Sequence, residues 1–273
     1  MTAGQVFIWP GRALYLGPLL DNDGHAHHAL QVSVGLEDTL SLQAPPDRRW
    51  RRYLAVATAP DQPHRLRCSG PIAQIYIDPG TSAGRTLRQQ MGDARVQPVN
   101  IEDAAGFAAA MGQAGSGQLD PAGLLRAIDG IIAGIDPVPR GSWIDPRVQQ
   151  ALTEVHASAG RRAPLPVLAG QVHLSPSRLA ALFRHDIGIP LRRYLLWLRL
   201  IDAVEALAAG ADLTRAAHHA GFADSAHLSR TFRRMFGMPP AVLQTQHVKL
   251  HDLAAGDPVA PSWTTGPVRA LQR

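Results

Sequence analysis

Cysteine and lysine are almost absent from this chain of 273 residues. Cys68 is the only cysteine, which excludes an internal disulfide framework and fits a reducing cytoplasm. Lys249 is the only lysine, so arginine carries nearly all of the positive charge, and arginine suits bidentate contacts to phosphate and guanine. No run of about 18 apolar residues occurs, so no membrane-spanning helix is expected. Met1–Gly17 lacks a basic lead before a long apolar run, so a signal peptide is not expected.

Hydrophobic residues make up 45% of the chain, which is enough for packed cores and excludes a largely disordered protein. The length leaves room for two domains. The net charge of +5 is unevenly placed: residues 1–160 carry 13 arginines and 15 carboxylates, whereas residues 161–247 carry 11 arginines and 5 carboxylates. The second part of the chain therefore has the charge that binding to nucleic-acid phosphates needs, although a solvated basic surface explains the charge equally well.

Residues 5–80 show the pattern of short β-strands. Several apolar runs are rich in Val, Ile, Leu or Tyr, and Pro, Gly, Asn and Asp clusters separate them. The runs are Val6–Trp9, Ala13–Leu16, Leu30–Leu36, Tyr53–Ala57, Leu66–Cys68 and Ile72–Ile77. This spacing predicts a small antiparallel barrel or sandwich.

From about Thr81 the pattern changes to helices, the first predicted over Asn100–Gly112. Asp120 and Pro121 then predict the N-cap and first turn of a second helix. Its apolar residues fall on one stripe: Leu124, Leu125, Ile128, Ile131, Ile132 and Ile135. The stripe fits either a helix packed on its own barrel or a dimerisation helix. Asp136–Gly141, with two prolines and a glycine, predicts a linker.

Two segments further on share one pattern, a short helix, a tight turn and a second helix that bears arginine. They are Ala169–Arg184 and Thr214–Arg234, and a continuous helical stretch, Leu191–Leu207, lies between them. Two such units in the basic part of a chain predict a DNA-reading module with two recognition helices. A helix from Asp145 to about Ser158 is predicted to precede the module, and the tail from about Ala254 is expected to be loosely ordered.

The turns and caps of the two units are readable from the sequence. In the first unit Ser175 is predicted to cap the recognition helix and Pro176 to take its first position. In the second unit Gly221 is expected in the turn, because glycine accepts a positive φ, and Asp224 or Ser225 is the predicted cap. Inward-facing residues are Leu168, Ala169, Val172, Leu179, Leu182, Phe183, Phe222, Leu228, Thr231, Phe232 and Met235 or Phe236. The remaining side chains are candidates for DNA contact: Ser177, Arg178, Ala181, Arg184, Ser225, Ala226, His227, Ser229, Arg230, Arg233 and Arg234.

Three stretches, HLSPSRLAALFRHDIGIPLRRY, LRLIDA and AGFADSAHLSRTFRRMFGMPP, resemble the AraC/XylS family of transcription regulators over Asp145–His247. The resemblance implies an all-α domain whose two recognition helices read successive major-groove segments on one face of promoter DNA. By position it places six residues at base-facing sites, namely Ser177, Ala180, Ala181, Ser225, Ala226 and Arg230. RNA polymerase, a small-molecule effector and a second copy of the chain are further candidate partners, and no membrane partner is expected.

Two departures from the family pattern bear on readout. His173 stands where the family has glycine in the first turn, and histidine is among the better tolerated residues at positive φ. The first recognition helix offers only small groups at base-facing positions, which give methyl contacts or weak hydrogen bonds. We therefore expect the second unit, with Arg230, to carry more of the sequence discrimination.

Histidines gather in the first part of the chain. His25 and His27 are two residues apart on an extended segment, so their side chains share a face, and His64 is expected to return on a neighbouring strand. The spacing is similar to the cupin metal motif, and imidazoles placed in this way can bind zinc, nickel or iron. Gln31 occupies the position of the motif's carboxylate, which argues against a metal or catalytic site because a neutral amide is a poor ligand.

Three interpretations of the cluster of His25, His27, Gln31 and His64 therefore stay open: a structural or dimer-facing cluster, an effector pocket, or a divalent-metal site. No cofactor is predicted outright. Cys68 is either a further soft ligand or a buried residue, and Arg48–Arg52 is either an anion site or an exposed loop.

The sequence as a whole predicts an α+β multidomain chain. Residues 1–98 are expected to form a small cupin-like β-barrel that acts as a sensor, 99–141 a helical dimerisation segment and linker, 142–250 the DNA-binding domain, and 251–273 a flexible tail. The predicted function is sequence-specific transcription regulation without enzymatic activity. The alternatives are a metal-dependent cupin enzyme with a DNA-binding appendage, which Gln31 disfavours, and an effector-free architectural protein, which the tandem motif disfavours.

Overall fold

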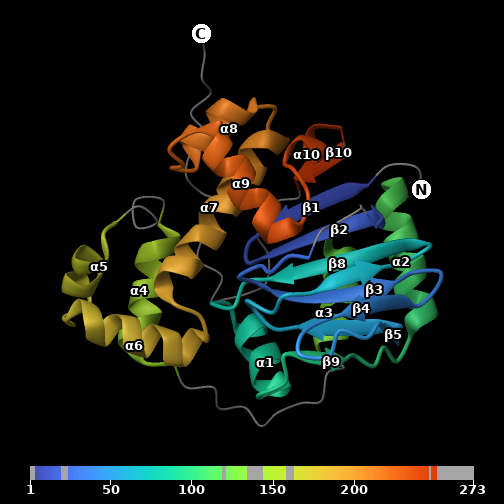
Figure 1. Cartoon of the computed structure of the whole chain (residues 1–273), viewed down its shortest axis with the longest axis horizontal. Helices are drawn as coiled ribbons and strands as arrows, with labels where there is room; N and C mark the ends of the chain where they lie inside the picture. The colour runs from blue at the N-terminus through green and yellow to red at the C-terminus, as the bar shows by residue number, and fades with distance from the viewer. Residues whose placement is uncertain are drawn as a thin grey trace.

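A seven-stranded sheet forms one side of the molecule, and helices α4, α5 and α6, within residues 146–187, lie on the other side (Figure 1). The computed structural model describes residues 4–19, 24–118, 121–133, 144–157, 163–245 and 247–250. The strand order is β10-β1-β2-β8-β3-β6-β9, and all neighbours are antiparallel except β10, which pairs parallel to β1. The bounds are β1 Gln5–Trp9, β2 Arg12–Pro18, β3 Leu30–Gly35, β6 Ala55–Thr58, β8 Pro71–Ile77, β9 Val96–Pro98 and β10 His247–Leu250.

A smaller sheet of three strands has the order β5-β4-β7, and its strands are β4 Leu40–Gln43, β5 Arg51–Tyr53 and β7 Arg65–Arg67. It shares a small apolar core with β6 through Leu40, Leu42, Val56 and Leu66. The expected barrel is not closed in the described part of the chain, because the large sheet ends at β10 on one side and β9 on the other. Helices cover the apolar faces that barrel closure would otherwise bury, so the sheet stays open.

Both faces of the large sheet are buried, and this explains its nearly continuous apolar strands. Along β1, Val6 and Ile8 point into one core while Phe7 and Trp9 point into the other. Five of the six predicted strand runs each match one strand, whereas the run Tyr53–Ala57 is divided at Leu54 between the end of β5 and β6. The strands β4, β9 and β10 and most of β5 were not anticipated.

Three helices cover one face of the sheet: α1 Ser82–Met91, α2 Ala104–Ser116 and α3 Pro121–Ala133. The predicted helix over 100–112 begins later, at Ala104, because Asp103 caps it and accepts a hydrogen bond from the Gly106 N–H at 2.8 Å. Most of the apolar stripe of α3 packs on the sheet, since Leu124, Ile128, Ile131 and Ile132 are buried in this core. The predicted cap Asp120, the stripe residue Ile135 and the linker Asp136–Gly141 lie outside the described residues.

Seven helices share the core on the opposite face of the sheet. They are α4 Pro146–His156, α5 Leu165–Gln171, α6 Pro176–Ile187, α7 Leu191–Ala208, α8 Leu213–His219, α9 Ser225–Phe236 and α10 Ala241–Thr245. Helices α7 and α9 contact the sheet, whereas α4, α5 and α6 lie to one side of it, beyond α7 (Figure 1). No helix in the described ranges is long and apolar enough to cross a membrane. One continuous core joins these helices to the sheet, with Tyr15 and Tyr76 from the strands packed in the same cluster as Trp197 and Phe236. The sheet therefore directly contacts α9 of the second predicted DNA-reading unit and the connecting helix α7.

Polar contacts also hold α6 and α7 against the N-terminal half of the chain. The Arg88 guanidinium of α1 donates to the His185 and Asp186 carbonyls at the end of α6, both at 3.1 Å. On α7, the Tyr194 hydroxyl donates to Asp78 Oδ2 at 3.2 Å. Arg193 lies beside it on α7 and its guanidinium is 2.6 Å from Asp61 Oδ2. Both α6 and α7 are thus held to the N-terminal half of the chain.

Candidate functional site

The first helix-turn-helix unit consists of α5 and α6. Ser175 caps α6 as predicted and accepts a hydrogen bond from the Arg178 N–H at 3.3 Å, with Pro176 in the first turn. His173 has a φ of 54°, which confirms that this histidine takes the left-handed turn position. The turn therefore forms without glycine, at a cost that the packing of the unit must offset.

The second unit consists of α8 and α9. Gly221 in its turn has a φ of 76°, as expected, and Phe222 directly after it is buried. Asp224 caps α9 by accepting from the His227 N–H at 2.5 Å, which decides between the two predicted caps. The helix bounds Ser225–Phe236 agree with the sequence prediction.

The predicted division of each recognition helix into inner and outer faces is observed. The inner positions are buried except Leu182, which is partly exposed. The outer face is open to solvent at nine positions, which are Ser177, Arg178, Ala181, Arg184, Ala226, His227, Arg230, Arg233 and Arg234. Ala180, Ser225 and Ser229 are partly exposed. Every candidate for DNA contact is thus accessible, as a contact with DNA requires.

The helix α7 sets the spacing of the two units. It has 18 residues, which corresponds to a length of about 27 Å at 1.5 Å per residue. Successive major-groove segments on one face of DNA are about 34 Å apart, so a connector of this length suits two recognition helices reading adjacent turns. Its side chains are mostly buried, which makes it a rigid spacer.

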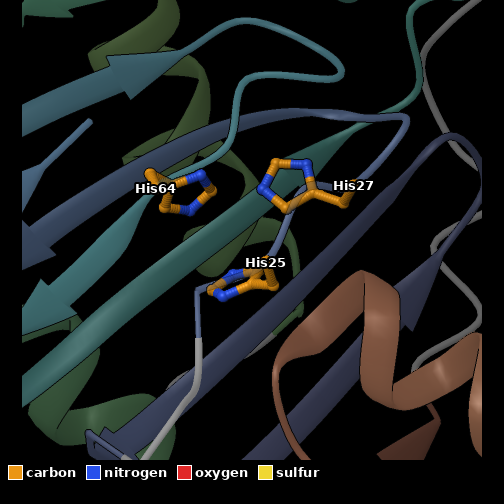
Figure 2. A group of neighbouring side chains, drawn as sticks. All are labelled: His25, His27 and His64. Carbon is orange, nitrogen blue, oxygen red and sulfur yellow. The ribbon is translucent and has the colours of Figure 1, made fainter. Parts of the chain in front are cut away.

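The three predicted histidines are brought together by the N-terminal sheet region (Figure 2). An isolated antiparallel bridge joins His25 to His64, with N–O distances of 3.1 and 2.9 Å. His25, His27 and His64 are 3%, 1% and 2% exposed, and their ring centroids are 4.5–6.0 Å apart. The expected return of His64 beside His25 and His27 is confirmed.

Hydrogen bonds orient two of these rings. Nδ1 of His27 lies 2.9 Å from the Ala29 carbonyl oxygen, and Nδ1 of His64 lies 2.9 Å from the Gln62 carbonyl oxygen. A carbonyl oxygen only accepts, so Nδ1 carries the proton in both rings. Burial, followed by the neighbouring His25, lowers the pKa of His27 to about 3, and the same causes lower the pKa of His64. Both rings are therefore neutral near pH 7.

Gln31 of β3 belongs to the same region. It is fully buried, and its amide Nε2 donates to the Ser33 hydroxyl at 2.6 Å. Cys68 is half-buried and is not part of the histidine group in the described chain. Arg48–Arg52 lies on an exposed hairpin, where Asp47 pairs with two of its arginines and Arg67 stacks on Trp50, and this favours the loop interpretation.

Sequence reasoning missed an apolar cavity between the sheet and the DNA-reading helices. Strand residues and helix residues both line it, among them Ile8, Tyr15, Tyr76, Trp197, Ile201 and Phe236. The apolar patterns of the strands and helices predict which side of each element is buried. The cavity forms where the sheet packs against the helices, and no short sequence pattern predicts how these elements pack together.

The family profile and the curated relatives match only part of the chain. A family profile described as a helix-turn-helix domain matches residues 168–246. A putative AraC-like transcription regulator of Streptomyces lividans is 35% identical over 116 residues, which is 42% of this chain and 36% of the relative. Another, from Streptomyces antibioticus, is 31% identical over 115 residues, covering 42% and 35% respectively. The chain therefore spans about a third of the length of these curated relatives.

Solved structures resemble the chain over most of its length. ToxT from Vibrio cholerae O395 has a TM-score of 0.55 at 11% identity, covering 86% of this chain and 97% of ToxT. Unsaturated fatty acid-bound ToxT from Vibrio cholerae strain SCE256 has a TM-score of 0.53 at 10% identity, covering 86% and 95%. At such low identity the likeness establishes a shared fold, in which a sheet region and a helical region combine.

The helical region carries the family evidence. The matched residues 168–246 contain both helix-turn-helix units, and two relatives identical at about a third of the aligned positions are named AraC-like. The observed turns, caps and exposed recognition faces agree with that assignment. This part of the chain is therefore similar to the helix-turn-helix domain of AraC-like transcription regulators.

Proposed function

We propose that this chain is a sequence-specific DNA-binding transcription regulator that inserts α6 and α9 into successive major-groove segments. The observation that carries the proposal is the pair of complete helix-turn-helix units with exposed, arginine-bearing outer faces. Net charge supports it, since residues 161–247 carry 11 arginines and 5 carboxylates. On α9, Arg230 is the candidate for base readout, and Arg233 and Arg234 near the helix end are candidates for phosphate contact.

We further propose that the N-terminal part, within 1–141, controls the DNA-binding part, within 142–250. Support comes from the shared core, in which strand side chains pack against α7 and α9. A ligand shifts such an equilibrium only if it binds two arrangements of the chain with different affinity. The apolar cavity lies at this contact, and ToxT, which has the same fold, has been solved with an unsaturated fatty acid bound. A small apolar molecule is therefore a candidate effector.

Other partners belong to the same proposal. RNA polymerase is a candidate partner because a promoter-bound regulator acts on transcription through it. A second copy of the chain is another candidate, although α3 already buries most of its apolar stripe on the sheet of its own chain. No enzymatic role is proposed.

The experiment that tests the proposal compares an enriched DNA site with a scrambled site of the same length and base composition at about 150 mM salt. We expect a preference of at least about 1000-fold for the enriched site, which is the low end for specific DNA-binding proteins. Both sites should bind more weakly as salt rises, since arginines replace phosphate counterions. Equal affinity for the two sites at every salt concentration would contradict the proposal and favour an architectural protein.

A further inference from the structure

The histidine cluster has the arrangement of a metal-binding site. The candidate ligand atoms of His25, His27 and His64 all lie within 4.8 Å of one another, and the three rings surround a common space (Figure 2). We propose that these three side chains bind one divalent transition-metal ion of the class that includes zinc, cobalt(II) and nickel(II).

Ring orientation is the first support for this site. Nδ1 of His27 and Nδ1 of His64 each donate to a backbone carbonyl, so Nε2 of each ring carries a lone pair. These two Nε2 atoms are buried and have no hydrogen-bond partner among the described residues. A buried imidazole nitrogen without a partner is costly, and a metal ion bound at Nε2 would satisfy it. A backbone carbonyl at the other nitrogen is also the usual second contact of a metal-bound histidine.

Distances are the second support. Nitrogen ligands about 2.1 Å from a tetrahedral zinc ion are about 3.4 Å from one another. The observed separations, up to 4.8 Å, come within this range after small rotations of the imidazole rings. The bridge between His25 and His64 fixes two of the backbone positions, so little ordering is needed on binding.

The ligand type selects the class of metal. Three neutral imidazoles suit zinc, nickel and cobalt, whereas magnesium and calcium prefer several carboxylate or carbonyl oxygens. Gln31 is fully buried, follows His27 by four residues, and has an amide oxygen with no hydrogen-bond partner in the described chain. As a weak neutral ligand it leaves the fourth coordination position to this oxygen or to a water molecule. The site would therefore keep the full positive charge of the ion.

A buried aromatic contact connects this site with the second recognition helix. The His27 ring packs edge-on against Tyr76, with centroids 5.3 Å apart. Tyr76 in turn contacts Phe236, the last residue of α9, at 5.5 Å and Trp197 of α7 at 6.2 Å. Reorientation of His27 on metal binding would therefore move side chains that hold α9. This link to DNA binding rests on the proposed function, whereas the metal site itself does not.

Cobalt(II) is the first probe, because its visible absorption reports four-coordinate binding. The metal-free full-length protein is expected to bind one cobalt(II) ion per chain, to exchange it for zinc, and to ignore magnesium at the same concentration. His27→Ala combined with His64→Ala should weaken binding by more than about 100-fold, since losing even an outer partner of a ligand costs 10–100-fold. His28→Ala is the matched control, because the His28 ring adjoins the cluster in sequence but pairs with Asp61. It should bind cobalt(II) as the unaltered chain does.

Folding of the variants is checked by circular dichroism and thermal unfolding. His64→Gln keeps more of the side-chain volume and should likewise lose the visible absorption of bound cobalt(II). If the double variant does not fold, this single variant tests whether the histidines bind the ion. Absence of cobalt(II) binding by the unaltered chain would overturn the proposed site. Unchanged affinity in folded His64→Gln and in the double variant would overturn it as well, because the ion would then bind elsewhere.

The link is tested by measuring affinity for enriched DNA with and without zinc. We expect a change of about 5-fold or more, and Tyr76→Leu should bind zinc normally but lose this response. Zinc binding without any change in DNA affinity would overturn the link. Failure to bind DNA in either state would instead contradict the proposed function, while the cobalt(II) result would still decide the metal site.

Discussion

Replacing Trp197 by alanine is expected to lower the free energy of unfolding by about 3–5 kcal/mol. This side chain on α7 is 2% exposed and lies where the two parts of the chain meet. Its ring contacts Tyr76 of β8 and Phe236 of α9, both with centroids 6.2 Å away. It also lines the apolar cavity, so truncation would enlarge an existing void, and the neighbouring side chains would fill it poorly.

Denaturant unfolding followed by circular dichroism measures this effect. Trp197→Phe should cost less, because an aromatic ring remains in the contact. Val167→Ala, at a side chain that is 50% exposed, is the control and should change stability by no more than about 0.5 kcal/mol. A loss below about 1 kcal/mol in Trp197→Ala would mean that the sheet and the helices do not share one core in solution.

Arg230→Ala is expected to weaken binding to the enriched DNA site by about 1–3 kcal/mol and to relax base preference at one position. Arg230 is exposed on the outer face of α9, in the second turn of the helix, where a side chain can reach base edges. Two-pronged hydrogen bonding to guanine is the contact that alanine cannot replace.

The control for this prediction is Arg49→Ala, which removes an arginine with an 86% exposed side chain from the β4–β5 hairpin. Its DNA affinity should equal that of the unaltered chain. An equal loss for Arg230→Ala on enriched and scrambled DNA would assign Arg230 to phosphate contact instead of base readout.

The DNA-reading region was predictable because its signals are local. Ser175 and Pro176 mark the start of one recognition helix, and Asp224 marks the start of the other. Gly221 marks a turn through its freedom at positive φ, and His173 was identified as its counterpart from the family resemblance. The spacing of apolar residues then predicts which face of each helix in the two units is buried.

The arrangement of the N-terminal part was less predictable. Six strand runs were found from their composition, but closure into a barrel is a long-range property, and the sheet stays open. Pairing of β10 with β1 joins segments from opposite ends of the chain, and no local pattern announces it. The helix α1, over Ser82–Met91, was missed although Thr81 caps it, since its sequence has few apolar residues to form a stripe.

The histidine cluster was predictable in part. Alternation along the strand placed His25 and His27 on one face, and the return of His64 was expected from the spacing of strands. The hydrogen bonds that orient the rings of His27 and His64 depend on the carbonyl groups of Ala29 and Gln62, and only the folded backbone shows these.

We expect one chain to read DNA with two helices, α6 and α9. Hydroxyl-radical footprinting of the full-length protein on DNA enriched from a random pool tests this most directly. We predict two protected blocks about 10 base pairs apart on one face of the duplex. Arg178→Ala with Arg184→Ala should weaken the block that α6 covers, and Arg230→Ala should weaken the other block. A single protected block that both sets of substitutions weaken equally, or protection without sequence preference, would contradict the claim.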